Sequence, residues 1–240
     1  MHPTPARHMA QSSQHAAPHR ITHACLDLDG TLAHSIPAMR AAYANFLKRF
    51  GIQDTDAEFQ ELNGPSLREI VDILKHRYNL SNDPHALLRG YTADIAAAYT
   101  DTVQPMPGAH AMLRELKAMG LTLILVTANV RAIASGFIAA QGWDALFDAA
   151  VFGDDVTHAK PAPHIYLAAL ERARAHAAHT AALEDSPNGV RSAAAAGLLP
   201  IGFAPDPAAA AALSAAGARR IISTLIELPS AINEFSEPAP

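Results

Sequence analysis

Two acidic residues, Asp27 and Asp29, stand at the end of an apolar run in the stretch CLDLDGTLAHS. Carboxylates repel one another and are costly to desolvate, so a pair at the end of a buried strand needs compensating charge. Alternate residues of an extended chain project to the same side, which lets both carboxylates face one ligand. The spacing indicates two carboxylates that act together on one substrate or one cation.

Polar residues also close later apolar runs. Thr127 ends the run LTLILVT, Glu184 and Asp185 end TAALED, and Lys160 lies in the loop HAKPAPH shortly after a further run. Paired carboxylates joined by a third from another strand make a hard oxygen site suited to Mg²⁺, and the lysine would offset part of their repulsion. We therefore predict that these residues gather with the first aspartate pair at one site.

The elements that must position these residues follow from the apolar pattern. Beyond residue 105, short apolar runs alternate with helical segments, which predicts a mostly parallel sheet. In such a sheet, ligands bind beyond the carboxyl ends of the strands. The strands that we predict are 21–29, 121–127, 149–153, 180–185 and 199–204.

Residues 35–104 show no strand pattern. Apolar residues recur there at helical spacing, and the break QPMPGAH follows. The sequence thus predicts an α/β core formed by residues 21–34 and 105–240, into which an all-helical unit is inserted. The helices that we predict in this unit span 39–50, 67–78 and 87–99.

Composition limits the range of functions. The chain has 240 residues, half of them hydrophobic, and a formal net charge of −5. The size allows a sizeable core, and the negative balance argues against binding to nucleic acid or to an anionic membrane. Cys25 is the only cysteine, which excludes an intramolecular disulfide and fits the cytoplasm. Residues 1–20 hold no apolar run of the kind that a secretory signal needs, and we expect a disordered tail there.

At these positions the sequence resembles the haloacid dehalogenase (HAD) superfamily, in particular its phosphatases with a helical cap after the first motif. The first family motif, Asp-x-Asp-Gly-Thr, corresponds to DLDGT at 27–31, and the second, a Ser or Thr after an apolar strand, to Thr127. The third is the lysine of KPAPHIYLAAL, and the fourth is the acidic pair of LEDSPNGVRSAAAAG. The resemblance implies a Rossmann-like core, with residues 35–104 as the cap.

The resemblance also implies a phosphomonoester hydrolase that works through an aspartyl-phosphate. Asp27 would be the nucleophile, and Asp29 would protonate the leaving group and then activate water. Thr127, Ala128 and Lys160 would bind the phosphoryl oxygens.

A Mg²⁺ cofactor is implied as well. A carboxylate oxygen of Asp27, the main-chain carbonyl of Asp29 and the carboxylate of Asp185 would hold the metal, with Glu184 acting through water. The partner would be a small phosphorylated metabolite, with no nucleic acid and no membrane involved. We expect a monomer or a weak homodimer.

The cap is expected to choose the substrate. Its segment LNGPSLREIVDIL resembles the loop that faces the active site in this branch, so Gly64, Ser66 and Arg68 are candidate substrate contacts. Arg68 offers two parallel hydrogen bonds to a carboxylate or phosphate, or it is a surface residue paired with Asp72 one turn further on. The segment favours a sugar phosphate, a sugar-acid phosphate or phosphoglycolate.

Other functions on the same fold remain open. A haloacid dehalogenase would not need Asp29 as an acid. A phosphonate hydrolase needs a cap lysine, and neither Lys48 nor Lys75 lies in the expected loop. A β-phosphoglucomutase-like phosphotransferase would carry a histidine where this chain has Met39. A non-catalytic binding module would have no use for the acid/base aspartate.

Overall fold

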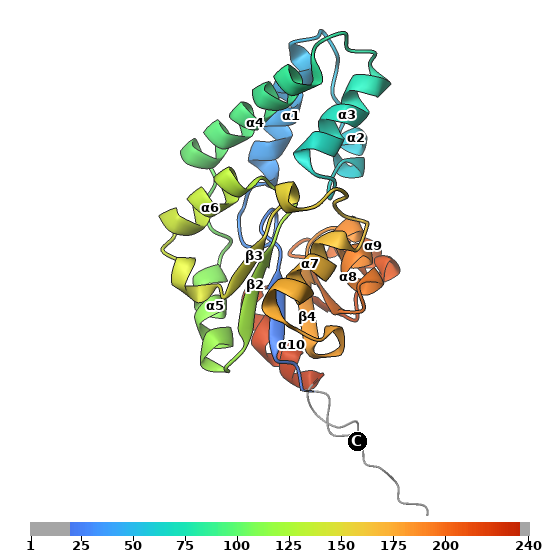
Figure 1. Cartoon of the computed structure of the whole chain (residues 1–240). Helices are drawn as coiled ribbons and strands as arrows, with labels where there is room; N and C mark the ends of the chain where they lie inside the picture. The colour runs from blue at the N-terminus through green and yellow to red at the C-terminus, as the bar shows by residue number, and fades with distance from the viewer. Residues whose placement is uncertain (1–19, 236–240) are drawn as a thin grey trace, which may run out of the picture.

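A sheet of six strands forms the centre of the protein (Figure 1). The computed structural model describes residues 20–235, so the predicted tail lies almost wholly outside the described residues. The five strands predicted from apolar runs are all present, and each is shorter than its run because the residues at the run's end leave the strand. The strands are β1 (His23–Leu26), β2 (Thr122–Val126), β3 (Ala149–Val151), β4 (Thr180–Glu184), β5 (Leu199–Phe203) and β6 (Arg220–Ile222).

All neighbouring strands are parallel, and they lie in the order β3-β2-β1-β4-β5-β6. In the central strand β1, His23 aligns with Thr122 of β2 on one side and with Thr180 of β4 on the other. The order reverses at β1, because the chain runs outward to β2 and β3 on one side and to β4–β6 on the other. Ligands of such sheets bind at this switch point, beyond the strands' carboxyl ends. The prediction of an α/β, Rossmann-like core is confirmed.

Helices cover both faces of the sheet (Figure 1). Within β1, Ala24 and Leu26 belong to one apolar cluster and Cys25 to another, as the two-residue period of a strand requires. No helix in the part of the chain that the structure describes is long and apolar enough to cross a membrane. The core helices are α5 (Ala109–Ala118), α6 (Arg131–Ala140), α7 (His164–Ala173), α8 (Pro187–Ala195), α9 (Pro207–Ala216) and α10 (Leu228–Glu234).

The edge strand β6 is absent from the sequence prediction. It has three residues, begins at the exposed Arg220 and pairs with β5 alone. A strand this short and this exposed lacks the continuous apolar run that reveals a strand buried on both faces.

Four of the five helices between β1 and β2 stand beyond the carboxyl ends of the strands (Figure 1). The three predicted helices of this segment are confirmed, whereas the prediction misses α2. Only six residues long, α2 is too short to show a helical period, and its start is fixed by Thr55, whose side chain accepts a hydrogen bond from the Glu58 amide. The four are α1 (Ile36–Lys48), α2 (Asp56–Glu61), α3 (Leu67–Arg77) and α4 (Pro84–Asp101).

Two chain segments join this helical unit, called the cap below, to the core, and they run side by side. The His34 amide donates to the Gln104 carbonyl at 2.8 Å, and the Met106 amide donates to the Leu32 carbonyl at 2.8 Å. The chain therefore leaves and re-enters the core at one place, which suits a cap that moves on a hinge. The cap limits of 35 and 104 remain a prediction.

Candidate active site

A tight loop after β1 places both aspartates of the first motif. Three successive amides, from residue 31 to residue 33, donate to the carbonyl of Leu28. Gly30 has a φ of +78°, and a Cβ there would lie 2.2 Å from Oδ2 of Asp185. Glycine is needed at this position because the backbone is left-handed and a carboxylate approaches it closely.

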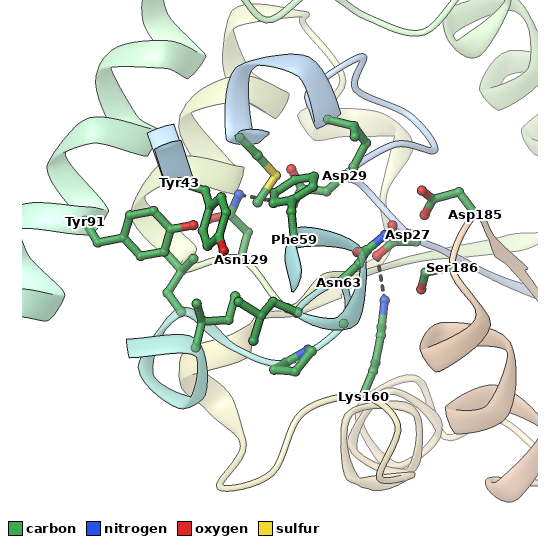
Figure 2. Close-up of a pocket in the computed structure, with 18 residues that line it drawn as sticks. Asp27, Asp29, Tyr43, Phe59, Asn63, Tyr91, Asn129, Lys160, Asp185 and Ser186 are labelled. Carbon is green, nitrogen blue, oxygen red and sulfur yellow. Dashed lines mark hydrogen bonds and ion pairs between the residues drawn. The ribbon is translucent and has the colours of Figure 1, made fainter. Parts of the chain in front are cut away.

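Lys160 is buried between two carboxylates. Its Nζ lies 2.6 Å from Oδ1 of Asp27, a contact drawn in Figure 2, and 2.5 Å from Oε1 of Glu184. The Tyr166 ring centroid lies 5.6 Å from the same Nζ, and the Tyr166 hydroxyl donates to Glu184 at 2.5 Å. Burial lowers the pKa of Lys160, but the two carboxylates outweigh it and raise that pKa overall. The ammonium therefore stays charged beside Asp27.

An acidic cluster lies next to this lysine. Asp27, Glu184 and Asp185 each offer one oxygen, and these oxygens lie within 4.8 Å of one another. Burial raises the pKa of Asp27 and of Asp185, the latter to about 8, and neighbouring carboxylates add to both increases while Lys160 opposes them. The single positive charge of Lys160 therefore does not balance the three carboxylates of the cluster. An all-oxygen donor set of this kind fits a hard divalent cation such as Mg²⁺.

Glu184 lies beside the other two carboxylates, and its predicted action through water remains a prediction. Its carboxylate belongs to the acidic cluster itself and makes a direct ion pair with Lys160. Because Glu184 is the last residue of β4 and fully buried, its side chain is held where the strand ends.

Hydrogen bonds hold the carboxylate of Asp29 from the cap side and from the core. Oδ1 accepts from the Ser35 hydroxyl at 2.7 Å and from the Tyr99 hydroxyl, and Oδ2 accepts from Asn129 Nδ2 at 3.1 Å. The Thr127 hydroxyl lies 3.5 Å from Oδ2. Tyr99 comes from the last turns of α4, so the cap contacts the second aspartate directly.

The side chains of the site enclose a pocket between the core and the cap (Figure 2). On the core side it is lined by Asp27, Asp29, Ala128, Asn129, Lys160, Asp185 and Ser186. On the cap side it is lined by Ile36, Met39, Tyr43, Phe59, Leu62, Asn63, Gly64, Pro65, Leu67, Ile70 and Tyr91.

Most of the predicted site residues meet at this pocket, including one of the three predicted from the cap, Gly64. Thr127 does not line the pocket. It is fully buried behind Asp29, and its hydroxyl accepts a hydrogen bond from the Asn129 amide at 3.0 Å. This places Ala128 and Asn129, and not the threonine, against the pocket. The predicted role of Thr127 in phosphate binding remains a prediction.

The other two predicted cap residues lie off the pocket. Ser66 is the N-cap of α3 and forms a capping box with Glu69, so its hydroxyl serves the helix. Arg68 is exposed, because Leu67 and Ile70 occupy the inward face of the same helix. The geometry does not place either residue at a bound substrate.

The cap also contacts the core beside the pocket. The Asn188 side chain donates to the Asn63 carbonyl at 2.6 Å, and a Cβ at Gly64 would lie 2.6 Å from Cβ of Asn188. Glu69 accepts from the Ala159 amide at 3.3 Å. These contacts hold the cap against the core.

Sequence reasoning missed several residues that build the site. Asn129 follows the second motif by two positions, and its strand-end location was the available signal. Ser35, Tyr99 and Tyr166 are buried and bond to site carboxylates. The sequence spacing does not identify the two tyrosines as site residues, because each lies in a helical apolar pattern. An aromatic residue in such a pattern usually belongs to the core.

Comparison with known proteins agrees with this geometry. A family model for haloacid dehalogenase-like hydrolases matches residues 25–202. The fructose-1-phosphate phosphatase YqaB of Escherichia coli (strain K12) is 31% identical over 176 residues, which cover 72% of this chain and 90% of that protein. A phosphorylated carbohydrates phosphatase of Thermotoga maritima is 27% identical over 172 residues, which cover 72% of this chain and 80% of the relative.

A solved structure shares the fold. CbbY from Rhodobacter sphaeroides in complex with phosphate aligns with a TM-score of 0.71 and 27% sequence identity, over 87% of this chain and 96% of that one. The fold and the site thus define a phosphatase with a Rossmann-like core. The chain belongs to the haloacid dehalogenase-like hydrolase family.

Proposed function

We propose that the protein is a Mg²⁺-dependent phosphomonoesterase that acts on a small phosphorylated metabolite through an aspartyl-phosphate on Asp27. The observation that carries this proposal is the buried pair of Asp27 and Lys160, 2.6 Å apart, beside an acidic cluster on the core side of the pocket. A nucleophile, a fixed cation and a set of metal-binding oxygens are thereby brought together from three separate chain segments.

In the first step, a carboxylate oxygen of Asp27 forms a bond to phosphorus while the bond to the leaving oxygen breaks. A carboxylate needs no base, because it has no proton to lose when ionised. Lys160 opposes the rise in the pKa of Asp27 and so favours its ionised form, and its positive charge would neutralise charge on the phosphoryl oxygens. Asp27, Glu184 and Asp185 would hold Mg²⁺, which when bound supplies further positive charge at the transferring group.

Asp29 serves as the general acid and then as the general base. It lines the same pocket as Asp27, and its protonated carboxyl group donates its proton to the leaving alkoxide and becomes a carboxylate. The ionised form then takes a proton from the water that attacks the phosphorus of the intermediate, which releases phosphate and restores Asp27. The bonds from Ser35, Tyr99 and Asn129 fix the orientation of this carboxylate.

The substrate is proposed to be a sugar phosphate, and the names of the two phosphatases above support this class. A phosphotransferase of the β-phosphoglucomutase kind is less well supported, because Met39 lines the pocket and carries no titratable proton. We further propose that the protein acts in the cytoplasm as a monomer or weak homodimer, and the single, buried cysteine supports a reducing compartment.

Metal removal tests the proposed cofactor. Excess EDTA should reduce hydrolysis of p-nitrophenyl phosphate to background, and added Mg²⁺ should restore it, because the carboxylates otherwise repel one another and the phosphoryl oxygens. The rate and the melting temperature should be measured on the same samples. A folded, EDTA-treated protein with undiminished activity would refute the metal dependence.

Tyr99→Phe tests the contact between the cap and the acid. Removing one hydrogen bond to a charged group costs about 1.5–3 kcal/mol, so kcat for alkyl phosphates should fall roughly 10- to 150-fold. The aryl ester p-nitrophenyl phosphate should lose less, because its leaving group does not need the proton. The edge-to-face packing of Tyr99 on Phe137, with centroids 5.6 Å apart, is retained by phenylalanine. Equal losses on both kinds of ester would instead assign Tyr99 a purely structural role.

A further inference from the structure

We propose that the leaving group of the substrate is electrically neutral and carries a hydroxyl, remote from the phosphate, that hydrogen-bonds to the Tyr91 phenol in the cap. This inference rests on the proposed phosphatase function and narrows its substrate class. It disfavours sugar-acid phosphates, phosphoglycolate and bisphosphates, all of which carry a second anionic group.

The cap side of the pocket is almost wholly apolar. Of its lining residues, only Asn63, Tyr43 and Tyr91 carry a polar side-chain atom, and none is ionisable near neutral pH. A second phosphate or a carboxylate placed there would lose its hydration without gaining a counter-ion, which is strongly unfavourable. The wall therefore selects against anionic leaving groups.

Two arginines of the cap form ion pairs with cap carboxylates and do not line the pocket. Arg40 pairs with Asp54 and Asp56, and Arg49 pairs with Asp94. Among the described residues of the cap, no arginine, lysine or histidine lines the pocket.

Two further cap cations also lie away from the pocket. Arg77 pairs with Glu58 at 2.6 Å and with Glu61 at 3.1 Å. Arg68 lies on the exposed side of α3. Within the described residues of the cap, no cation therefore faces the place that an anionic substrate group would occupy.

The two pocket tyrosines differ in what their hydroxyls do. The Tyr43 hydroxyl donates to Glu58, which also accepts from Tyr78 at 2.8 Å and from Arg77, so Tyr43 offers the pocket mainly its ring. Tyr91 lines the pocket and is 2% exposed, and its hydroxyl makes no hydrogen bond to residues 20–235.

Besides the Asn63 carboxamide at the edge nearer the core, Tyr91 is therefore the polar group that the apolar wall leaves for a ligand. Its ring is fixed against Phe46, with centroids 5.0 Å apart, and Figure 2 shows its hydroxyl directed toward Tyr43 within the pocket. Because this hydroxyl is free to bond to a ligand in the pocket, a neutral substrate hydroxyl can pair with it without bringing charge into the cap.

Three phosphomonoesters of one length test the inference: pentyl phosphate, 5-hydroxypentyl phosphate and 5-phosphooxypentanoate. For the wild-type protein, kcat/KM should be highest for the hydroxyl ester, roughly 3- to 10-fold lower for the methyl-ended ester, and at least about 100-fold lower for the carboxylate ester. Tyr91→Phe should bring the hydroxyl ester down to the methyl-ended ester and leave the latter unchanged.

Tyr43→Phe is the matched control. It removes a phenol from the same pocket, but one bonded to Glu58, so any loss should be the same for all three esters. The inference would be overturned if the wild-type protein had the same kcat/KM for the carboxylate ester as for the hydroxyl ester. It would also be overturned if Tyr91→Phe and Tyr43→Phe changed kcat/KM for the three esters in the same way. Hydrolysis of p-nitrophenyl phosphate distinguishes failure of this inference from failure of the phosphatase proposal. No hydrolysis of this aryl ester would refute the phosphatase proposal itself, whereas its hydrolysis together with the wrong order among the three alkyl esters would refute only the neutral-hydroxyl inference.

Discussion

Asp27→Asn should abolish turnover, with kcat for p-nitrophenyl phosphate at least about 1,000-fold below that of the wild-type protein. The amide is almost isosteric with the carboxylate, but its oxygen is a poor nucleophile. The fold should survive, because Lys160 keeps its ion pair with Glu184 at 2.5 Å when the charge of Asp27 is lost.

The measurement is kcat together with the melting temperature of the same preparation. A variant that stays folded and turns over at a rate near that of the wild-type protein would rule out Asp27 as the nucleophile. Arg68→Ala is a suitable control, since an exposed residue off the pocket should leave the hydrolysis of this small aryl ester unchanged.

Asp29→Asn should affect the two steps of the reaction, phosphorylation of Asp27 and hydrolysis of the aspartyl-phosphate, to different extents. General acid–base catalysis is typically worth about 100- to 10,000-fold, so alkyl phosphates should lose activity in that range. An aryl leaving group departs without a proton, so p-nitrophenyl phosphate should still phosphorylate Asp27. The intermediate should then accumulate, because no carboxylate remains to activate water.

The expected signature is a burst of p-nitrophenol, about one per enzyme molecule, followed by a slow steady state. Single-turnover kinetics on one alkyl and one aryl ester would show it. Loss of the burst, together with equal losses on both esters, would contradict the acid/base role of Asp29.

The central sheet was predictable because its strands are buried on both faces. Such strands must be continuous apolar runs, and a polar residue that ends the run marks the carboxyl end of the strand. Asp27, Thr127 and Asp185 could therefore be assigned to one site from sequence alone. β6 and α2 were not predictable, since neither is long enough to show a period.

The cap side of the site was predicted less well, for a different reason. A helix has several faces, and spacing alone does not say which of them meets the pocket. For Arg68 the sequence left a substrate contact and a surface position both open; the residue is exposed, while Leu67, one position earlier, lines the pocket. Tyr91 and Tyr99 are ordinary members of an apolar helical pattern, and only their neighbours in three dimensions give their hydroxyls a role.

The most direct test of the account is to locate the phosphoryl group on the protein. Asp29→Asn should be mixed with p-nitrophenyl phosphate and Mg²⁺, quenched during the slow phase and reduced with borohydride, which converts an aspartyl-phosphate to homoserine. Peptide mass spectrometry should find homoserine at position 27 only when substrate is present. Phosphate or homoserine at any other residue, or an unmodified Asp27 in a sample that has shown the burst, would contradict the account.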